Sequence, residues 1–141
     1  KNAKMISEAL QPFAKSNGPI HLPEFSCCTE GPRSTCDNGC RHAYYKFYVY
    51  IRPQNLAPGW SRDRIVHEIS KRDVPCFQGS CSEVYLERAF DGASLRPEKR
   101  LANAKLLGET SLMFLVHPTL LENEMTETVA VIQDVIRMAS S

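Results

Sequence analysis

The chain has 141 residues, 43% of them hydrophobic and 23% charged, which suits one soluble globular domain with a core of its own. A formal net charge of +1, without any run of lysines and arginines, argues against nucleic acid or an anionic membrane as partner. No apolar run approaches the roughly 20 residues that span a bilayer. The chain opens without a signal peptide, and its six cysteines stand in a chain with too much regular helix and strand to need disulfides, so we expect a cytoplasmic, reduced protein. It also opens without an initiator methionine, so we expect a piece of a longer protein.

The first third of the chain predicts a helix, a short strand and a loop. Residues 2–14 carry apolar side chains at helical spacing, and Gly18 and Pro19 favour the end of that helix. Residues 20–22 suit a short edge strand. Residues 23–41 are rich in Pro, Gly, Ser, Thr and Cys and show no period, so we expect a cysteine-rich loop there.

Residues 42–53 carry the strongest pattern in the chain. One face of an extended chain would hold Ala43, Tyr45, Phe47, Val49 and Ile51, and the other would hold Tyr44, Lys46, Tyr48 and Tyr50. This period of two, in aromatic and β-branched residues, predicts an inner strand that ends at Pro53. The outer tyrosines are expected to pack as a layer against a helix rather than to form an aromatic binding platform.

The middle of the chain alternates helix and strand patterns. Ser61 is a suitable N-cap for a helix whose inward face holds Ile65, Val66 and Ile69. Residues 74–77 suit a short strand, and a turn follows. Ser82 then predicts the start of a further helix that carries Val84, Tyr85, Leu86, Ala89 and Phe90.

The last third continues the alternation. Pro97 is expected in the first turn of a helix that ends at Gly108 and carries Leu101, Ala104, Leu106 and Leu107. Residues 111–116 form an apolar run of strand length. Thr119 and Glu122 have capping-box spacing before a final helix with one apolar stripe.

This order predicts an α/β (α+β) fold in a single domain over residues 1–141. We expect a small mixed or antiparallel sheet of about three or four strands, covered mainly on one face by about four or five helices.

No self-contained catalytic motif is present, so the site candidates are weak by themselves. The turn from Cys76 to Tyr85 joins a strand end to a helix start, where backbone N–H groups and small hydroxyls can meet a polar ligand. Composition alone favours the simpler interpretation, a glycine turn with a helix cap, by at least about two to one. Cys81 as a nucleophile needs a base, and none is visible nearby. His42 and His117 lie at strand ends, where structural histidines are also common.

A cysteine cluster in the loop raises the alternative of a metal site. Four thiols can bind zinc, and they are Cys27, Cys28, Cys36 and Cys40. Their spacing is not that of paired Cys-x-x-Cys knuckles, so free thiols or an adventitious disulfide compete with structural zinc. The alternative function is therefore a non-enzymatic binding module, stabilised by zinc through this loop.

Three segments together resemble the small C-terminal domain of the DegT/StrS-type sugar aminotransferases, which are fold type I enzymes dependent on pyridoxal phosphate. The first is the His-x-Tyr strand, His42-Ala-Tyr-Tyr-Lys-Phe-Tyr. The second runs from Arg64 through Val74-Pro-Cys-Phe-Gln-Gly-Ser-Cys-Ser-Glu-Val-Tyr, and the third is Leu107-Gly-Glu-Thr-Ser-Leu-Met-Phe-Leu-Val-His-Pro-Thr-Leu with the helix that follows.

The resemblance implies a homodimer that moves an amino group, usually from glutamate, to a nucleotide-linked keto-sugar. It also implies that pyridoxal 5'-phosphate is held by a lysine of a large domain that this chain lacks, so we expect the chain alone to bind no cofactor and to be inactive. The family's His-Tyr loop pair is absent here, where the sequence reads Gln78-Gly-Ser-Cys-Ser-Glu. The resemblance therefore implies the position of this substrate-side loop but not the roles of its side chains. The substrate-facing candidates are Gly79, Ser80, Cys81, Tyr85 and His42.

Overall fold

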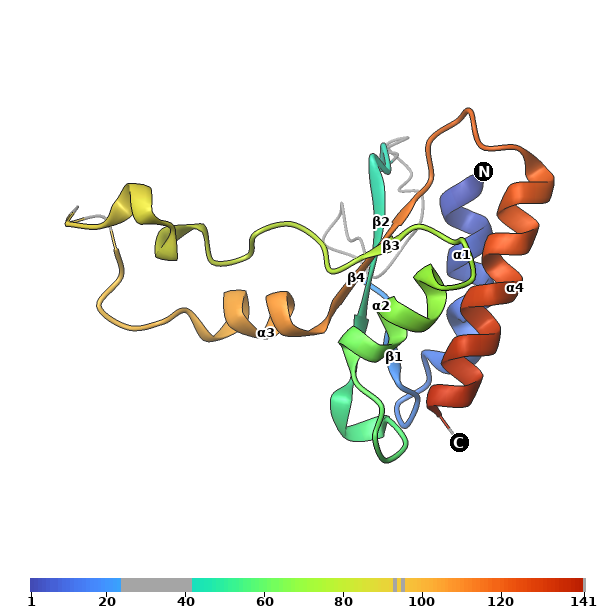
Figure 1. The fold of residues 1–141 in the computed structure, drawn as a ribbon, viewed down its shortest axis with the longest axis horizontal. Coiled ribbons are helices and arrows are strands. Elements are labelled where there is room, and N and C mark those ends of the chain that lie inside the picture. The colour runs from blue at the N-terminus through green and yellow to red at the C-terminus, as the bar shows by residue number, and fades with distance from the viewer. Residues whose placement is uncertain (24–41, 93, 95, 141) are drawn as a thin grey trace, which may run out of the picture.

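The computed structural model describes residues 1–23, 42–92, 94 and 96–140, and Figure 1 shows their arrangement. The helices are α1 (Asn2–Leu10), α2 (Arg62–Ser70), α3 (Ala102–Thr110) and α4 (Glu122–Ala139), and the strands are β1 (Ile20–His21), β2 (Lys46–Ile51), β3 (Cys76–Phe77) and β4 (Ser111–Leu115). Short 3₁₀ turns lie at Gln11–Phe13, Pro53–Asn55, Val84–Leu86 and Arg88–Phe90.

The described strands form one antiparallel sheet in the order β1-β2-β4-β3. The tyrosine-rich strand β2 is therefore an inner strand, as its pattern predicts. Its register with β4 pairs Phe47 with Phe114 and Val49 with Leu112, so apolar side chains from both inner strands share one face.

That face carries the hydrophobic core. Helices α1, α2 and α4 lie along the same side of the sheet in Figure 1, and each contributes fully buried side chains to the cluster around Phe114. Ile6, Ile65 and Ile132, one from each helix, are 0–1% exposed. The helical apolar stripes predicted for these three segments are confirmed, and so is the fold class.

The start of the predicted strand is wrong. Tyr44 has a positive φ of 48°, which an extended strand does not allow, and β2 begins only at Lys46. Tyr45, predicted to face the same side as Phe47, is 85% exposed. The period of two therefore holds from residue 46 onward.

The α-helix predicted from Ser82 does not form. Two separate 3₁₀ turns take its place, divided by Glu87, whose backbone is extended at φ −63° and ψ 148°. The Arg96 guanidinium holds the segment in this form, because it donates to the carbonyls of Tyr85, Leu86 and Glu87.

Helix α3 is also displaced from its prediction. It begins after Leu101, so Pro97 lies outside it, and it runs two residues past Gly108 to Thr110. The predicted apolar stripe does not enter the core, since Leu106 is 57% exposed and Leu107 is 44% exposed. Hydrophobic spacing indicates a helix, but not which partner covers it.

The N-terminus of α4 is capped two residues later than predicted. The Glu124 carboxylate accepts a hydrogen bond from the Leu121 backbone N–H at 2.7 Å, which is half of a capping box. Thr119, the predicted cap, instead pairs its hydroxyl with Nδ1 of His117 at 2.7 Å.

The cap of α2 gives a test of the fold. The Ser61 hydroxyl oxygen accepts from the Arg64 backbone N–H at 3.1 Å. We predict that Ser61→Ala lowers the free energy of unfolding by about 1 kcal/mol, because one orphan N–H loses its acceptor. Urea unfolding measures the change. Ser61→Asp, which keeps an acceptor, should unfold like the wild type, and equal loss in both variants would contradict the capping role.

Candidate functional site

The sheet face opposite the core helices carries a polar, aromatic cavity. It has a volume of about 320 Å³, and its lining residues, called the tyrosine pocket below, are Pro23, His42, Tyr44, Tyr45, Lys46, Tyr48, Tyr50 and Ser80. Alternation along β2 explains the lining, since Phe47, Val49 and Ile51 point into the core and leave the residues between them for the other face.

The prediction that the outer tyrosines pack against a helix is thus wrong for Tyr48 and Tyr50. Both are half-buried and line the pocket. Burial raises the pKa of the Tyr50 hydroxyl above its usual value, and the nearby Tyr48 adds to the rise. The Tyr50 hydroxyl is therefore protonated at neutral pH and able to donate a hydrogen bond.

The turn after β3 closes one side of this pocket. The hydroxyls of Tyr48 and Ser80 are 2.9 Å apart and hydrogen bonded. Gly79 has φ +96°, and a Cβ there would lie 3.0 Å from both the Tyr48 ring and the Ser111 hydroxyl. The glycine therefore serves two purposes: it allows the left-handed backbone and lets the turn lie directly against β2.

His42 stands at the mouth of the pocket. Its Nδ1 accepts from the Tyr44 backbone N–H at 3.0 Å, and the two rings are 4.3 Å apart. The contact holds the histidine ring beside the positive-φ residue. His42 and Ser80, two of the substrate-facing candidates, are thereby brought to one cavity.

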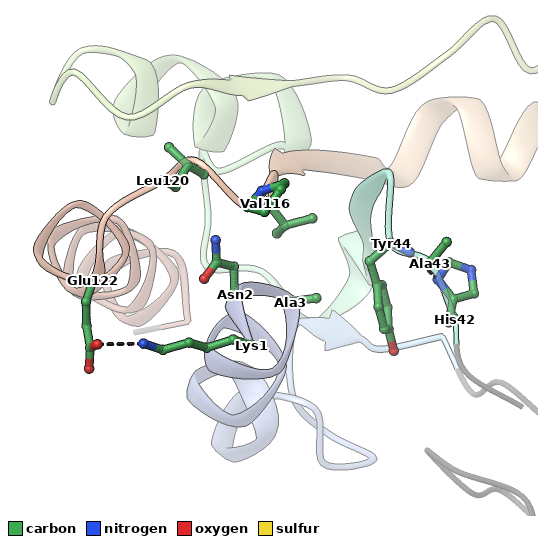
Figure 2. Close-up of a pocket in the computed structure, with 10 residues that line it drawn as sticks. Lys1, Asn2, Ala3, His42, Ala43, Tyr44, Val116, Leu120 and Glu122 are labelled. Atoms are coloured by element: carbon green, nitrogen blue, oxygen red, sulfur yellow. Dashed lines mark hydrogen bonds and ion pairs between the residues drawn. The ribbon is translucent and has the colours of Figure 1, made fainter. Parts of the chain in front are cut away.

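His42 also borders a second cavity, which Figure 2 shows between the start of α1 and the loop before α4. Its volume is about 450 Å³, and it is lined by Lys1, Asn2, Ala3, His42, Ala43, Tyr44, Val116, Pro118, Leu120 and Glu122. Lys1 and Glu122 form an ion pair of 2.6 Å in which both side chains are mostly exposed. That pair lowers the pKa of Glu122 and neutralises the two charges. This cavity is the weaker candidate for a charged substrate.

Cys81 and Tyr85 lie away from both cavities. The Cys81 thiol donates to the Glu87 carboxylate at 3.4 Å, and this bond raises the thiol pKa. A raised pKa disfavours the thiolate, which argues against Cys81 as a nucleophile. The Tyr85 hydroxyl donates to Glu83 at 2.7 Å and accepts from the Leu101 N–H at 3.0 Å, so it is engaged in local structure.

Sequence reasoning missed Lys46, Tyr48 and Tyr50 as site residues. The signal was present in the alternation of β2, which placed them together on one face. What the sequence lacked was the position of the helices: had they covered both faces, the same tyrosines would have been core-facing.

A metal site is not supported by the described residues. Among them, no group of three His, Cys, Asp or Glu side chains is placed to hold an ion. Cys27, Cys28, Cys36 and Cys40 lie outside the described residues, so the zinc hypothesis stays a prediction. Cys76 is 4% exposed, and burial raises its pKa to about 12. It packs as a small hydrophobic side chain.

Pyridoxal phosphate, implied by the resemblance, does not fit the described residues. It needs an amine for a Schiff base, and fold type I sites also bind its phosphate group, commonly at a helix N-terminus. Lys46 supplies an amine to the tyrosine pocket, but no carboxylate and no helix start is among the residues that line it. The N-terminus of α2 is already capped by Ser61 and carries Asp63 in its first turn.

Gly79 gives a test of the close approach that shapes the pocket. We predict that Gly79→Ala costs about 1–3 kcal/mol in the free energy of unfolding, through strain at positive φ plus crowding. Gly92→Ala is the matched control, because Gly92 also has positive φ, at +74°, but a Cβ there meets nothing within 4 Å. Urea unfolding of both variants measures the difference. Equal destabilisation would show that the contact with Tyr48 is unimportant.

A scan against models of protein families and a search of curated proteins each find no match. Solved structures do match. The X-ray structure of the aminotransferase from Psychrobacter cryohalolentis matches with 48% sequence identity and a TM-score of 0.83. The match covers 99% of this chain and 34% of that one. None of the described helices is long and apolar enough to cross a membrane.

More distant structures share the fold. A DegT DnrJ EryC1 StrS aminotransferase from Brucella abortus has a TM-score of 0.63 at 19% identity, over 94% of this chain and 29% of that one. The S. venezuelae DesV structure, in complex with a ketimine intermediate, has a TM-score of 0.63 at 16% identity, over 96% and 31%. This chain thus spans about a third of the length of the chains that it matches. These matches agree with the resemblance seen in the sequence: the chain is similar to one part of an aminotransferase at 48% identity, and it shares its fold with an aminotransferase of the DegT DnrJ EryC1 StrS type.

Proposed function

We propose that this chain is the C-terminal domain of a pyridoxal-phosphate-dependent aminotransferase that acts on a nucleotide-linked keto-sugar. The observation that carries the proposal is the 48% identity to an aminotransferase over 99% of the chain. In this proposal the domain closes over the substrate, and the Schiff-base lysine belongs to the large domain. The complete protein would be a cytoplasmic homodimer.

The tyrosine pocket supports a sugar substrate. Sugars present many hydroxyls, and the pocket offers matching groups: the hydroxyls of Tyr48, Tyr50 and Ser80 and the imidazole of His42. Tyrosine rings also give flat apolar surface for the C–H faces of a sugar ring. A cavity of about 320 Å³ lies at the small end of ligand-site volumes, which suits a sugar but not a whole nucleotide sugar.

Lys46 supplies a positive charge that can pair with the negative charge of such a substrate. Its ammonium lies 5.5 Å from the centre of the Tyr45 ring, and it is the cation among the residues that line the tyrosine pocket. A nucleotide-linked sugar carries a diphosphate, and a lysine ammonium attracts phosphate oxygens. We therefore assign Lys46 to the diphosphate and the hydroxyl groups to the sugar.

The Ser80–Tyr48 hydrogen bond has a positioning role in this proposal. It fixes the direction of the Tyr48 hydroxyl before substrate arrives, so less rotational freedom is lost on binding. Gly79 holds Ser80 in place through its contact with β2. Pyridoxal phosphate, when bound in the complete enzyme, supplies the electron sink for amino transfer. The residues of this chain bind and orient the sugar.

Lys46 gives the test of substrate recognition. In the complete polypeptide, we predict that Lys46→Gln raises KM for the nucleotide sugar about tenfold, equivalent to about 1.4 kcal/mol, because a charge-assisted contact to phosphate is lost. KM for the amino donor and the cofactor absorbance should not change. Steady-state kinetics measures all three.

Lys71→Gln is the matched control, since Lys71 is an exposed lysine at the end of α2 and outside the pocket. It should leave every constant unchanged. A Lys46→Gln enzyme with an unaltered KM for the sugar nucleotide would remove the pocket from substrate binding. Loss of cofactor absorbance in that variant would instead place Lys46 at the cofactor and contradict the assignment.

A further inference from the structure

The turn that closes the tyrosine pocket is short, and the sheet alone does not hold it. The strand before it, β3, has only the two residues Cys76 and Phe77, fewer than most strands. Gln78 and Ser80 of the turn are both exposed. The hydrogen bond of 2.9 Å between the hydroxyls of Ser80 and Tyr48 therefore depends on contacts that fix the backbone of the turn.

Ser111, the first residue of β4, makes the main contact with this turn. Its hydroxyl donates to the Gln78 carbonyl at 2.5 Å. Ser111 pairs with Tyr50 in the sheet, so its side chain lies on the same face as the tyrosine pocket. A Cβ on Gly79 would lie 3.0 Å from the same hydroxyl. Ser111 thus fixes the carbonyl before Gly79 and limits the space that Gly79 can occupy.

Arg62, the first residue of the core helix α2, holds Ser111 in turn. Its guanidinium donates to the carbonyls of Ser111 and Gly108 at 3.1 and 3.0 Å, and its contact with the Gln78 carbonyl is longer, at 3.5 Å. Gly108 lies in the last turn of α3, where carbonyls without a helical partner favour a cation. The Arg62 side chain is only 13% exposed, so these carbonyls take the place of water around its charge.

Asp63 ties the side chain of the turn to the same helix. Its carboxylate accepts from Nε of Arg62 at 2.7 Å and from the amide Nε2 of Gln78 at 3.0 Å. Hydrogen bonds to charged groups are the stronger ones, and the planar guanidinium serves several acceptors in a fixed geometry. The backbone and the side chain of Gln78 are therefore both held at the start of α2, one through Ser111 and the other through Asp63.

We propose that Arg62 and Ser111 are positioning residues of the tyrosine pocket. Together they hold the turn in the place where the Ser80 hydroxyl meets that of Tyr48. Neither Arg62 nor Ser111 is among the residues that line the pocket, so both act on the substrate through Ser80. The inference rests on the proposed function and deepens it, because it links a helix on the core face of the sheet to sugar recognition on the other face.

Ser111→Ala is the main test, because it removes one hydroxyl and no buried charge. In the complete polypeptide, we expect KM for the nucleotide sugar to rise about three- to tenfold, the effect of one hydrogen bond. The kcat and KM for the amino donor should not change. Arg62→Gln should raise the same KM, and Ser111→Ala decides the test where that variant does not fold. An unaltered KM for the nucleotide sugar in Ser111→Ala would overturn the proposal.

Arg64→Gln is the matched control. Arg64 is an exposed arginine in the same turn of α2, and its guanidinium donates to the Gly59 carbonyl at 3.0 Å, away from the pocket. It should leave all three constants unchanged. A rise in both KM values together with a fall in kcat after Ser111→Ala would show general damage to the fold, and this result too would overturn the positioning role.

Ser80→Ala tests whether Ser111 acts through Ser80. It removes the partner of the Tyr48 hydroxyl, so it should itself raise KM for the nucleotide sugar. Residues that act through one contact are not additive. The variant with both Ser80→Ala and Ser111→Ala should therefore have the KM of Ser80→Ala alone. Increases that multiply would show that Ser111 acts independently of Ser80, which contradicts the proposal.

The positioning role and the proposed function fail in different ways. A wild-type enzyme that is active, but whose Ser111→Ala variant keeps its KM for the nucleotide sugar, would refute the positioning role and leave the function intact. A wild-type polypeptide without activity on nucleotide-linked keto-sugars would refute the function. Amide hydrogen exchange in residues 78–80 then reads the hold on the turn: faster exchange in Ser111→Ala than in Arg64→Gln would support it, and equal exchange would overturn it.

Discussion

The structure depends on one constraint, the one-sided burial of the β2–β4 pair. Phe47 lies opposite Phe114 on the face that α1, α2 and α4 cover. Because side chains alternate along a strand, burying that face forces Lys46, Tyr48 and Tyr50 onto the other one. The tyrosine pocket is therefore a consequence of core packing. Its residues cannot shift by one position without exposing the core.

The packed body and the described residues of 82–110, between β3 and β4, are held by different forces. Apolar burial holds the body, whose largest core side chains are fully inaccessible. Charge-assisted hydrogen bonds hold the segment between β3 and β4, from Arg96 to backbone carbonyls and from Arg100 to Glu83. Such bonds fix a conformation with little apolar burial. They leave Leu101, Leu106 and Leu107 partly exposed.

Sequence patterns predicted the body well because local signals and burial agree there. The stripe of α4, the cap at Ser61 and the alternation from Lys46 onward all match the structure. They failed between Ser82 and Phe90, where two 3₁₀ turns replace the predicted helix and the side chain of Arg96 bonds to the backbone carbonyls. Only part of the tyrosine pocket was predicted: Ser80 and His42 were named from the segments that resemble the aminotransferases. The place of Tyr48 in the pocket could not be predicted, because the sequence does not say which face of the sheet the core helices leave uncovered.

The central claim is that this chain supplies the substrate side of an aminotransferase and not its Schiff-base lysine. Incubation of the 141-residue chain with pyridoxal phosphate, borohydride reduction and peptide mapping test it most directly, because reduction makes every imine permanent. The account predicts slow, partial labelling spread over exposed lysines, without a saturable absorbance band. Rapid, stoichiometric labelling of one lysine, Lys46 above all, would contradict it.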